Sequence, residues 1–198
     1  MILNNRILAT LAGHEHNNAF LQSLTPVSLN YGEVLIAPSA PIRHTYFLTS
    51  GIACWFTTMA EGVAVANYLI GREGLVGIPL LFQGASVPNV TVVMQVAGSA
   101  MRIDARRFLD EINKPGNLQS IMRRYTLARL SAMAQTAACN SLHCIQERLA
   151  CWLLLIADRC GPEFKITHEV LADMLGARRA TVSVEAARFS QRGLISYG

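Results

Sequence analysis

The chain has 198 residues, a formal net charge of +4 and a 52% share of hydrophobic residues. This apolar content excludes a disordered chain and permits a substantial core, while the modest positive charge permits nucleic-acid binding without requiring it. The first residues lack the basic leader, apolar core and cleavage site of a signal peptide, and the longest apolar runs are too short to cross a bilayer. We therefore expect a cytoplasmic protein with no membrane partner.

Residues 2–24 carry apolar positions at a spacing that suits short amphipathic helices. From residue 27 the pattern changes to short segments rich in β-branched and aromatic residues, separated by turn signals such as Ser50-Gly51 and Ala97-Gly98. The predicted strands are 27–29, 34–36, 45–48, 52–57, 64–70, 90–96 and 100–103. Short strands with frequent turns predict a small antiparallel β-barrel or jelly roll.

Helical patterning returns at residues 105–112, is interrupted at Lys114-Pro115-Gly116, and resumes as a long helix over residues 118–138. The apolar stripe of this long helix either packs inside the chain or pairs with a second copy, and we favour a dimer seam. The predicted seam residues are Leu118, Ile121, Met122, Tyr125, Leu130 and Met133. A further helix over residues 142–160 is expected to pack into the C-terminal module.

Five cysteines, Cys54, Cys139, Cys144, Cys151 and Cys160, are present and none are spaced as CxxC. An odd number in a reducing compartment does not indicate a disulfide framework. Cysteine within a helix usually behaves as a small core residue, and a redox or metal role for the three between residues 139 and 151 is the less favoured alternative.

Residues 164–195 predict two helices joined by a glycine turn. Thr167 is positioned to cap the first helix, and Gly176 is positioned to end it with a positive φ angle. The second helix has Val182, Ala186 and Phe189 on one face, which leaves Arg179, Ala180, Ser183, Val184 and Ala187 on the exposed face. This pattern is typical of a helix-turn-helix, whose second helix enters the DNA major groove.

An ordinary helical hairpin is the alternative interpretation of residues 164–195. Arginine dominates the second helix, because Arg178, Arg179, Arg188 and Arg192 are accompanied by a single acid, Glu185. Arginine is the side chain best suited to read guanine and to bind phosphate. This charge pattern favours double-stranded DNA as the partner. We expect Glu185 to pair with Arg188 or Arg192.

Four stretches of sequence resemble the Crp/Fnr family of bacterial transcription regulators over essentially the whole chain. They are GEVLIAPSAPIRHTYFLTSG at 32–51, GREGLVGIPLLFQ at 71–83, AQTAACNSLHCIQERLACWLLLIADRCG at 134–161 and THEVLADMLGARRATVS at 167–183. The resemblance implies an α+β fold with an N-terminal antiparallel β-roll or jelly roll (residues 1–113), a long central dimerisation helix (114–140) and a C-terminal winged helix-turn-helix (141–198). It also implies a homodimer with RNA polymerase as a further partner.

The resemblance carries over to single residues of the second helix. Arg179 falls on the arginine that typically contacts guanine, and Arg178 and Thr181 match positions that usually touch phosphate. Ala180 stands where many members have glutamate, and Val184 where many have a second arginine, which implies a different operator. The predicted DNA-binding residues are Thr167, Arg178, Arg179, Ala180, Thr181, Ser183, Val184 and Arg188.

The sensing site departs from that of cyclic-nucleotide binders in the family. Gly77-Ile78-Pro79 stands where those proteins have Gly-Glu-Leu, and no arginine occurs near residues 88–92 to neutralise a phosphate. The chain also lacks the N-terminal cysteine cluster of iron–sulfur sensors, and a lone His44 is more often a structural hydrogen-bonding residue than a haem ligand. We therefore expect no cyclic nucleotide, metal or other cofactor, and leave the effector unknown.

The resemblance leads us to expect a β-hairpin wing after Gly193, but the sequence stops where its first strand would begin, so the predicted winged module is truncated. One alternative function is therefore a β-roll sensor that acts through protein partners with an impaired DNA module. A cupin-like enzyme is a further alternative, but His44 is the only histidine of the β region, and no Ser-His-Asp set, P-loop or zinc signature is present. We predict no catalytic residues.

Overall fold

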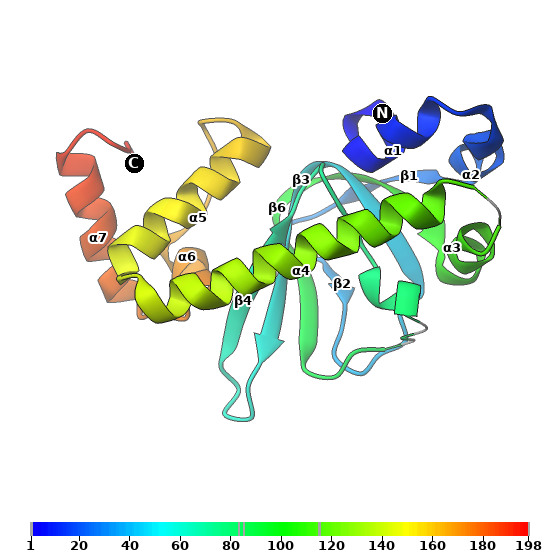
Figure 1. The fold of residues 1–198 in the computed structure, drawn as a ribbon. Helices are drawn as coiled ribbons and strands as arrows, with labels where there is room; N and C mark the ends of the chain where they lie inside the picture. The colour runs from blue at the N-terminus through cyan, green and yellow to red at the C-terminus, as the bar shows by residue number, and fades with distance from the viewer. Residues whose placement is uncertain (1, 83, 85, 115, 198) are drawn as a thin grey trace.

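The computed structural model describes residues 2–82, 84, 86–114 and 116–197 (Figure 1). Its N-terminal part consists of four short helices: η1 (Ile2–Asn4), α1 (Arg6–Ala12), η2 (Glu15–Asn17) and α2 (Asn18–Gln22). Asn5 caps α1, because its side-chain oxygen accepts hydrogen bonds from the backbone N–H groups of Ile7 and Leu8. Across the described residues, none of the helices is both long and apolar enough to cross a bilayer.

One antiparallel sheet forms the β-roll. Its strands are β1 (Thr25–Leu29), β2 (Val34–Ile36), β3 (His44–Thr58), β4 (Ala64–Ile70), β5 (Leu75–Val76) and β6 (Val90–Asp104), and the 3-10 helix η3 (Ile78–Phe82) follows β5. The strand order is β1-β6-β3-β4, with β2 also paired to β6 and β5 to β3. The predicted antiparallel β-roll is therefore confirmed.

The predicted turns at Ser50-Gly51 and Ala97-Gly98 are wrong, because both dipeptides lie inside long strands. The register between β3 and β6 shifts on either side of Ser50, and Gly51 has a φ of +76°. A Cβ at Gly51 would lie 2.6 Å from the carbonyl oxygen of Val96, so the two strands approach at a distance that only glycine permits. These glycines bend the paired strands instead of ending them.

The C-terminal part contains α3 (Ala105–Ile112), α4 (Leu118–Leu142), α5 (Ile145–Cys160), α6 (His168–Leu175) and α7 (Arg179–Gln191). In Figure 1, α4 crosses the front of the β-roll and leads to the group formed by α5, α6 and α7. The junction between α4 and α5 is short, and Cys144 begins α5 with a capping box completed by Glu147. Those bonds from Cys144 lower the pKa of the Glu147 carboxyl.

Two hydrophobic cores hold this arrangement. The first lies inside the β-roll and includes side chains of α1, α2, α3 and the first half of α4. The second joins the outer faces of β3 and β4, through Ile52, Phe56 and Leu69, to α5, α6 and α7. The C-terminal helices are therefore packed directly on the β-roll of the same chain.

Part of the predicted dimer seam lies on the inner face of α4, which packs against the β-roll of the same chain. Leu118, Met122 and Tyr125 are buried in the first core, and Ile121 and Met133 are half-buried against it. A side chain that fills its own β-roll is not available to a second copy. Of the six predicted seam residues only Leu130 is openly exposed, at 59%, and it shares the outer face with Leu127, which is 65% exposed and was missed.

Candidate nucleic-acid interface

The first helix of the predicted helix-turn-helix is α6, and both of its ends agree with the sequence prediction. Thr167 caps it, since its hydroxyl oxygen accepts a hydrogen bond of 3.2 Å from the backbone N–H of Val170. Gly176 ends it in the left-handed conformation, with a φ of +59°. A Cβ at Gly176 would lie 3.3 Å from the side chain of Val65 in β4, so the turn also packs on the β-roll.

The second helix, α7, separates a buried face from an open one. Val182, Ala186 and Phe189 are buried, and the helix packs against α5 and α6. The open face at its N-terminal end is basic and otherwise made of small side chains. Its exposed residues are Arg178, Arg179, Ala180, Thr181, Val184 and Arg188.

Two predicted DNA-binding residues are already engaged within the protein. Ser183 is half-buried, and its hydroxyl lies 3.0 Å from Nδ1 of His168 in α6. Thr167 is exposed, but its hydroxyl oxygen serves as the cap of α6. The hydroxyl of Ser183 therefore links α7 to α6. The sequence analysis placed Ser183 on the exposed face of the helix and did not predict this contact.

Glu185 orients one arginine of α7. Its carboxylate is buried and accepts a hydrogen bond of 2.7 Å from Nη1 of Arg188, whose side chain is 60% exposed. This confirms the expected pairing and names Arg188 as the partner. Within the described residues, no ion pair occupies Arg178, Arg179 or Arg192, so these guanidinium groups keep their charge free for an external anion.

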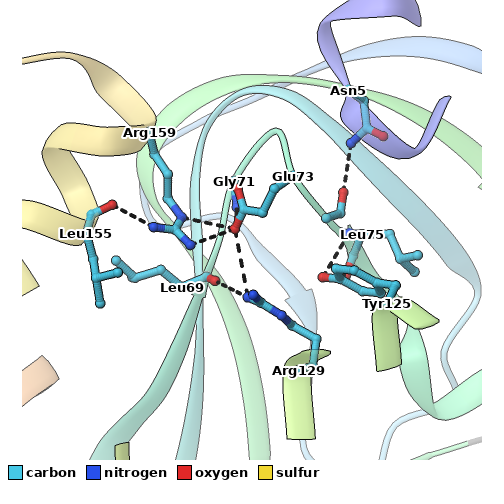
Figure 2. A network of polar contacts seen from close by, with 10 residues as sticks. Asn5, Leu69, Gly71, Glu73, Leu75, Tyr125, Arg129, Leu155 and Arg159 are labelled. Carbon is cyan, nitrogen blue, oxygen red and sulfur yellow. Dashed lines mark hydrogen bonds and ion pairs between the residues drawn. The ribbon is translucent and has the colours of Figure 1, made fainter. Parts of the chain in front are cut away.

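A polar network connects the β-roll to the C-terminal helices, and sequence analysis did not find it (Figure 2). Glu73, in the loop between β4 and β5, accepts hydrogen bonds of 3.0 and 2.8 Å from Nε and Nη2 of Arg159 at the end of α5. Arg129 of α4 lies 3.8 Å from the same carboxylate oxygen and donates to the carbonyl oxygen of Leu69. The sequence signal was the acid in GREG, but its partner is 86 positions away.

The segment Gly77-Ile78-Pro79, which the resemblance aligns with the Gly-Glu-Leu of cyclic-nucleotide binders, lies at the start of η3. Gly77 has a φ of +126°, and Ile78, which follows it, is half-buried at the start of η3. A Cβ at Gly77 would lie 2.8 Å from the hydroxyl oxygen of the buried Thr45. Over the described ranges, no three His, Cys, Asp or Glu side chains are grouped to hold a metal ion.

Two family models match the chain. A cyclic nucleotide-binding domain matches residues 26–114, which contain the β-roll, and a Crp-like helix-turn-helix domain matches residues 147–198, which contain α6 and α7. The chain belongs to the Crp/Fnr family. It is thus a Crp-like transcription regulator with a DNA-binding helix-turn-helix, and its family consists of regulators and not of enzymes.

Relatives of this Crp/Fnr protein agree with that assignment. A CRP-like cAMP-activated global transcriptional regulator of Mycobacterium tuberculosis is 25% identical over 186 residues, which cover 89% of this chain and 82% of the relative. The regulator CLP of Xanthomonas campestris has the same fold, with a TM-score of 0.73 at 14% identity and 96% of each chain covered. FixK2 of Bradyrhizobium japonicum gives a TM-score of 0.73 at 15% identity, with 88% of each chain covered.

Proposed function

We propose that this Crp/Fnr protein acts as a homodimer that reads an operator of two half-sites with α7. The observation that carries the proposal is the open face of α7, where free guanidinium groups stand beside small side chains at the end that would enter the groove. In helix-turn-helix proteins, the N-terminal residues of the second helix contact base edges. Small neighbours let such a helix lie deep in the groove.

Each residue of the α7 interface has a role in the proposal. Arg179 donates to guanine O6 and N7, and Val184 contacts a thymine methyl group. Arg178 and Thr181 bind phosphate, and Arg188, held by Glu185, binds phosphate at the groove edge. Ala180 leaves room where a carboxylate would accept from cytosine, so the operator differs from that of family members with glutamate there.

The outer face of α4 is the proposed dimer seam. Leu127 and Leu130 are its large apolar side chains, and Ala134 and Ala138 continue the same face toward the C-terminal end of the helix. A twofold pairing along this face would place two copies of α7 on successive half-sites of one operator. RNA polymerase is the expected further partner of the DNA-bound dimer.

The input signal of the proposed regulator is not a cyclic nucleotide. Ile78 supplies no carboxylate for the ribose, and no arginine follows near residues 88–92 to neutralise the phosphodiester. Titration with cyclic AMP and cyclic GMP should therefore leave both thermal stability and DNA affinity unchanged.

A salt series of fluorescence-anisotropy titrations with operators selected from a randomised library tests the DNA proposal. Arg179→Ala should relax base preference at one position of each half-site, at a cost of about 1–3 kcal/mol for the preferred base. Arg107→Ala, on an exposed arginine of α3, is the matched control. Absence of sequence-dependent binding at low salt would instead support a sensor that acts through protein partners.

Sedimentation velocity tests the seam. Leu127→Glu and Leu130→Glu should each give monomers, because each would bury two symmetry-related carboxylates in a seam whose large side chains are leucines. Leu3→Glu is the control, since Leu3 is an equally exposed leucine at 69% but lies in η1. A dimer that survives both α4 substitutions would move the interface elsewhere.

A further inference from the structure

A cavity of about 220 Å³ lies where α4, α5 and the end of β4 meet. Its apolar wall includes Leu69, Trp152 and Leu155, and Tyr68 lies beside them. Three arginines, Arg129, Arg148 and Arg159, line the same cavity from α4 and α5. The volume is below the roughly 300–1,000 Å³ of pockets for drug-sized ligands, so an occupant must be small.

The positive charge of this cavity is only partly neutralised. Arg159 is paired with Glu73, whereas Arg148 donates through Nη2 to the carbonyl oxygen of Leu175, at 2.5 Å, and so has a neutral acceptor. Arg129 donates to the carbonyl oxygen of Leu69 and is 3.8 Å from Glu73. One carboxylate, Glu73, therefore lies near two of the three guanidinium groups, and within the described residues Arg148 has no carboxylate partner.

Two donors of the cavity arginines lack acceptors. Nε of Arg129 and Nε of Arg148 are both buried, and within the described part of the chain neither has a hydrogen-bond partner. Buried N–H groups of charged side chains are rarely left without an acceptor, because their desolvation is then uncompensated. Both Nε–H groups are shielded from water, so the donors that an occupant of the cavity can reach are the terminal guanidinium nitrogens of these arginines.

We propose that this cavity binds a small organic carboxylate. A carboxylate supplies the acceptor oxygens and the negative charge that the guanidinium groups lack, and a compact hydrocarbon body fits against Trp152, Leu155 and Leu69. An inorganic ion such as phosphate would lose its hydration against that apolar wall without contacting it favourably. The site is distinct from the open face of α7 and from the loop that corresponds to the nucleotide site, and the proposal does not depend on DNA reading.

The position of the cavity gives its occupant a route to the DNA-binding helices. Arg148 holds the last turn of α6 through the carbonyl oxygen of Leu175. Figure 2 shows how Arg159 holds the loop after β4 through Glu73. A carboxylate between the arginines competes with Glu73 and strengthens the contacts between α4 and α5. Occupancy therefore alters how firmly the C-terminal helices are held on the β-roll.

Benzoate is the probe for the experiment, with benzamide as its neutral counterpart and inorganic phosphate as the purely ionic one. Sodium benzoate at roughly ten times its dissociation constant should raise the thermal midpoint of the full chain by about 3–5 °C. Benzamide and phosphate, at the same concentration and ionic strength, should raise it by less than a third of that shift. Fluorescence of Trp152 in a Trp55→Phe background reports occupancy independently of stability.

Arg148→Lys is the decisive variant. Lysine keeps a cation that can donate to the carbonyl oxygen of Leu175 but lacks the second terminal nitrogen of the guanidinium group, so benzoate should bind at least tenfold more weakly. Arg107→Lys, far from the cavity, should bind benzoate as the unmodified protein does. The proposal is overturned if benzoate causes no shift, if benzamide or phosphate matches it, or if Arg148→Lys binds benzoate with unchanged affinity.

Discussion

The link between Glu73 and Arg159 gives the sharpest prediction about stability. Both hydrogen bonds from Arg159 end on Oε1 of Glu73, and the side chains are only 13% and 20% exposed. Glu73→Gln keeps an acceptor oxygen but removes the charge, so Arg159 and Arg129 lose their shared counter-ion. A charge-assisted hydrogen bond contributes about 1.5–3 kcal/mol, and exposed pairs contribute about 0–1 kcal/mol.

We expect Glu73→Gln to lower the free energy of unfolding by about 2 kcal/mol. This loss falls in the range of charge-assisted hydrogen bonds, above that of exposed pairs, because both side chains are largely shielded from water. Urea unfolding followed by circular dichroism measures the loss. Since the two hydrophobic cores share β3, a single cooperative transition is expected, and the midpoint then reports global stability.

A double-mutant cycle separates the pair from its surroundings. Glu73→Gln and Arg159→Gln should each be destabilising, while the double variant should lose about 1 kcal/mol less than the sum of both. The control is Glu111→Gln, because its partner Lys114 is 59% exposed and such a pair contributes about 0.5 kcal/mol or less. Equal losses for Glu73→Gln and Glu111→Gln, or strict additivity in the cycle, would refute the reasoning.

Three further predictions follow from single residues. Burial raises the pKa of Tyr125 to about 12, so its contribution to the free energy of unfolding is complete below about pH 10 and falls by about 3 kcal/mol as the pH rises to 12. Urea midpoints should therefore decline less steeply with pH for Tyr125→Phe, whereas Tyr31→Phe, at an exposed tyrosine, should show the decline of the unmodified protein. Gly51→Ala should cost at least about 2 kcal/mol, against about 1 kcal/mol for Gly62→Ala, whose Cβ would meet nothing within 4 Å; equal urea midpoints would contradict this. Thr167→Ala should cost about 1 kcal/mol through the lost cap of α6, and an unchanged midpoint would show that the cap contributes nothing.

Local patterns in the sequence predicted much of the fold. The bounds of β2, β4 and α3 agree with the predicted segments, because each is a short run of one periodicity between clear turn or break signals. The cap at Thr167 and the left-handed Gly176 were equally local, since both depend on neighbours within four positions. The family resemblance supplied the order of the modules.

Long-range relations account for the errors. Ser50-Gly51 has the composition of a turn, and only its approach to β6 shows that the glycine serves a bend within β3. The periodicity of α4 marks an apolar face but does not say whether that face is buried by the same chain or by a second one. The acid in GREG did not by itself reveal the role of Glu73, because that role depends on Arg159, 86 positions away.

The two faces of α4 explain how one helix can serve both modules. Its inner face is anchored in the β-roll by Met122 and Tyr125, whose hydroxyl group accepts a hydrogen bond from the backbone N–H of Leu75. Its C-terminal half instead lines the arginine cavity beside α5. There Arg129 donates a hydrogen bond to the carbonyl oxygen of Leu69 in β4. We therefore expect a change at the cavity or at Glu73 to act on α5 and not on the anchored first half of α4. Since α5 packs on α7, such a change would also reach the face of α7 that we propose to read DNA.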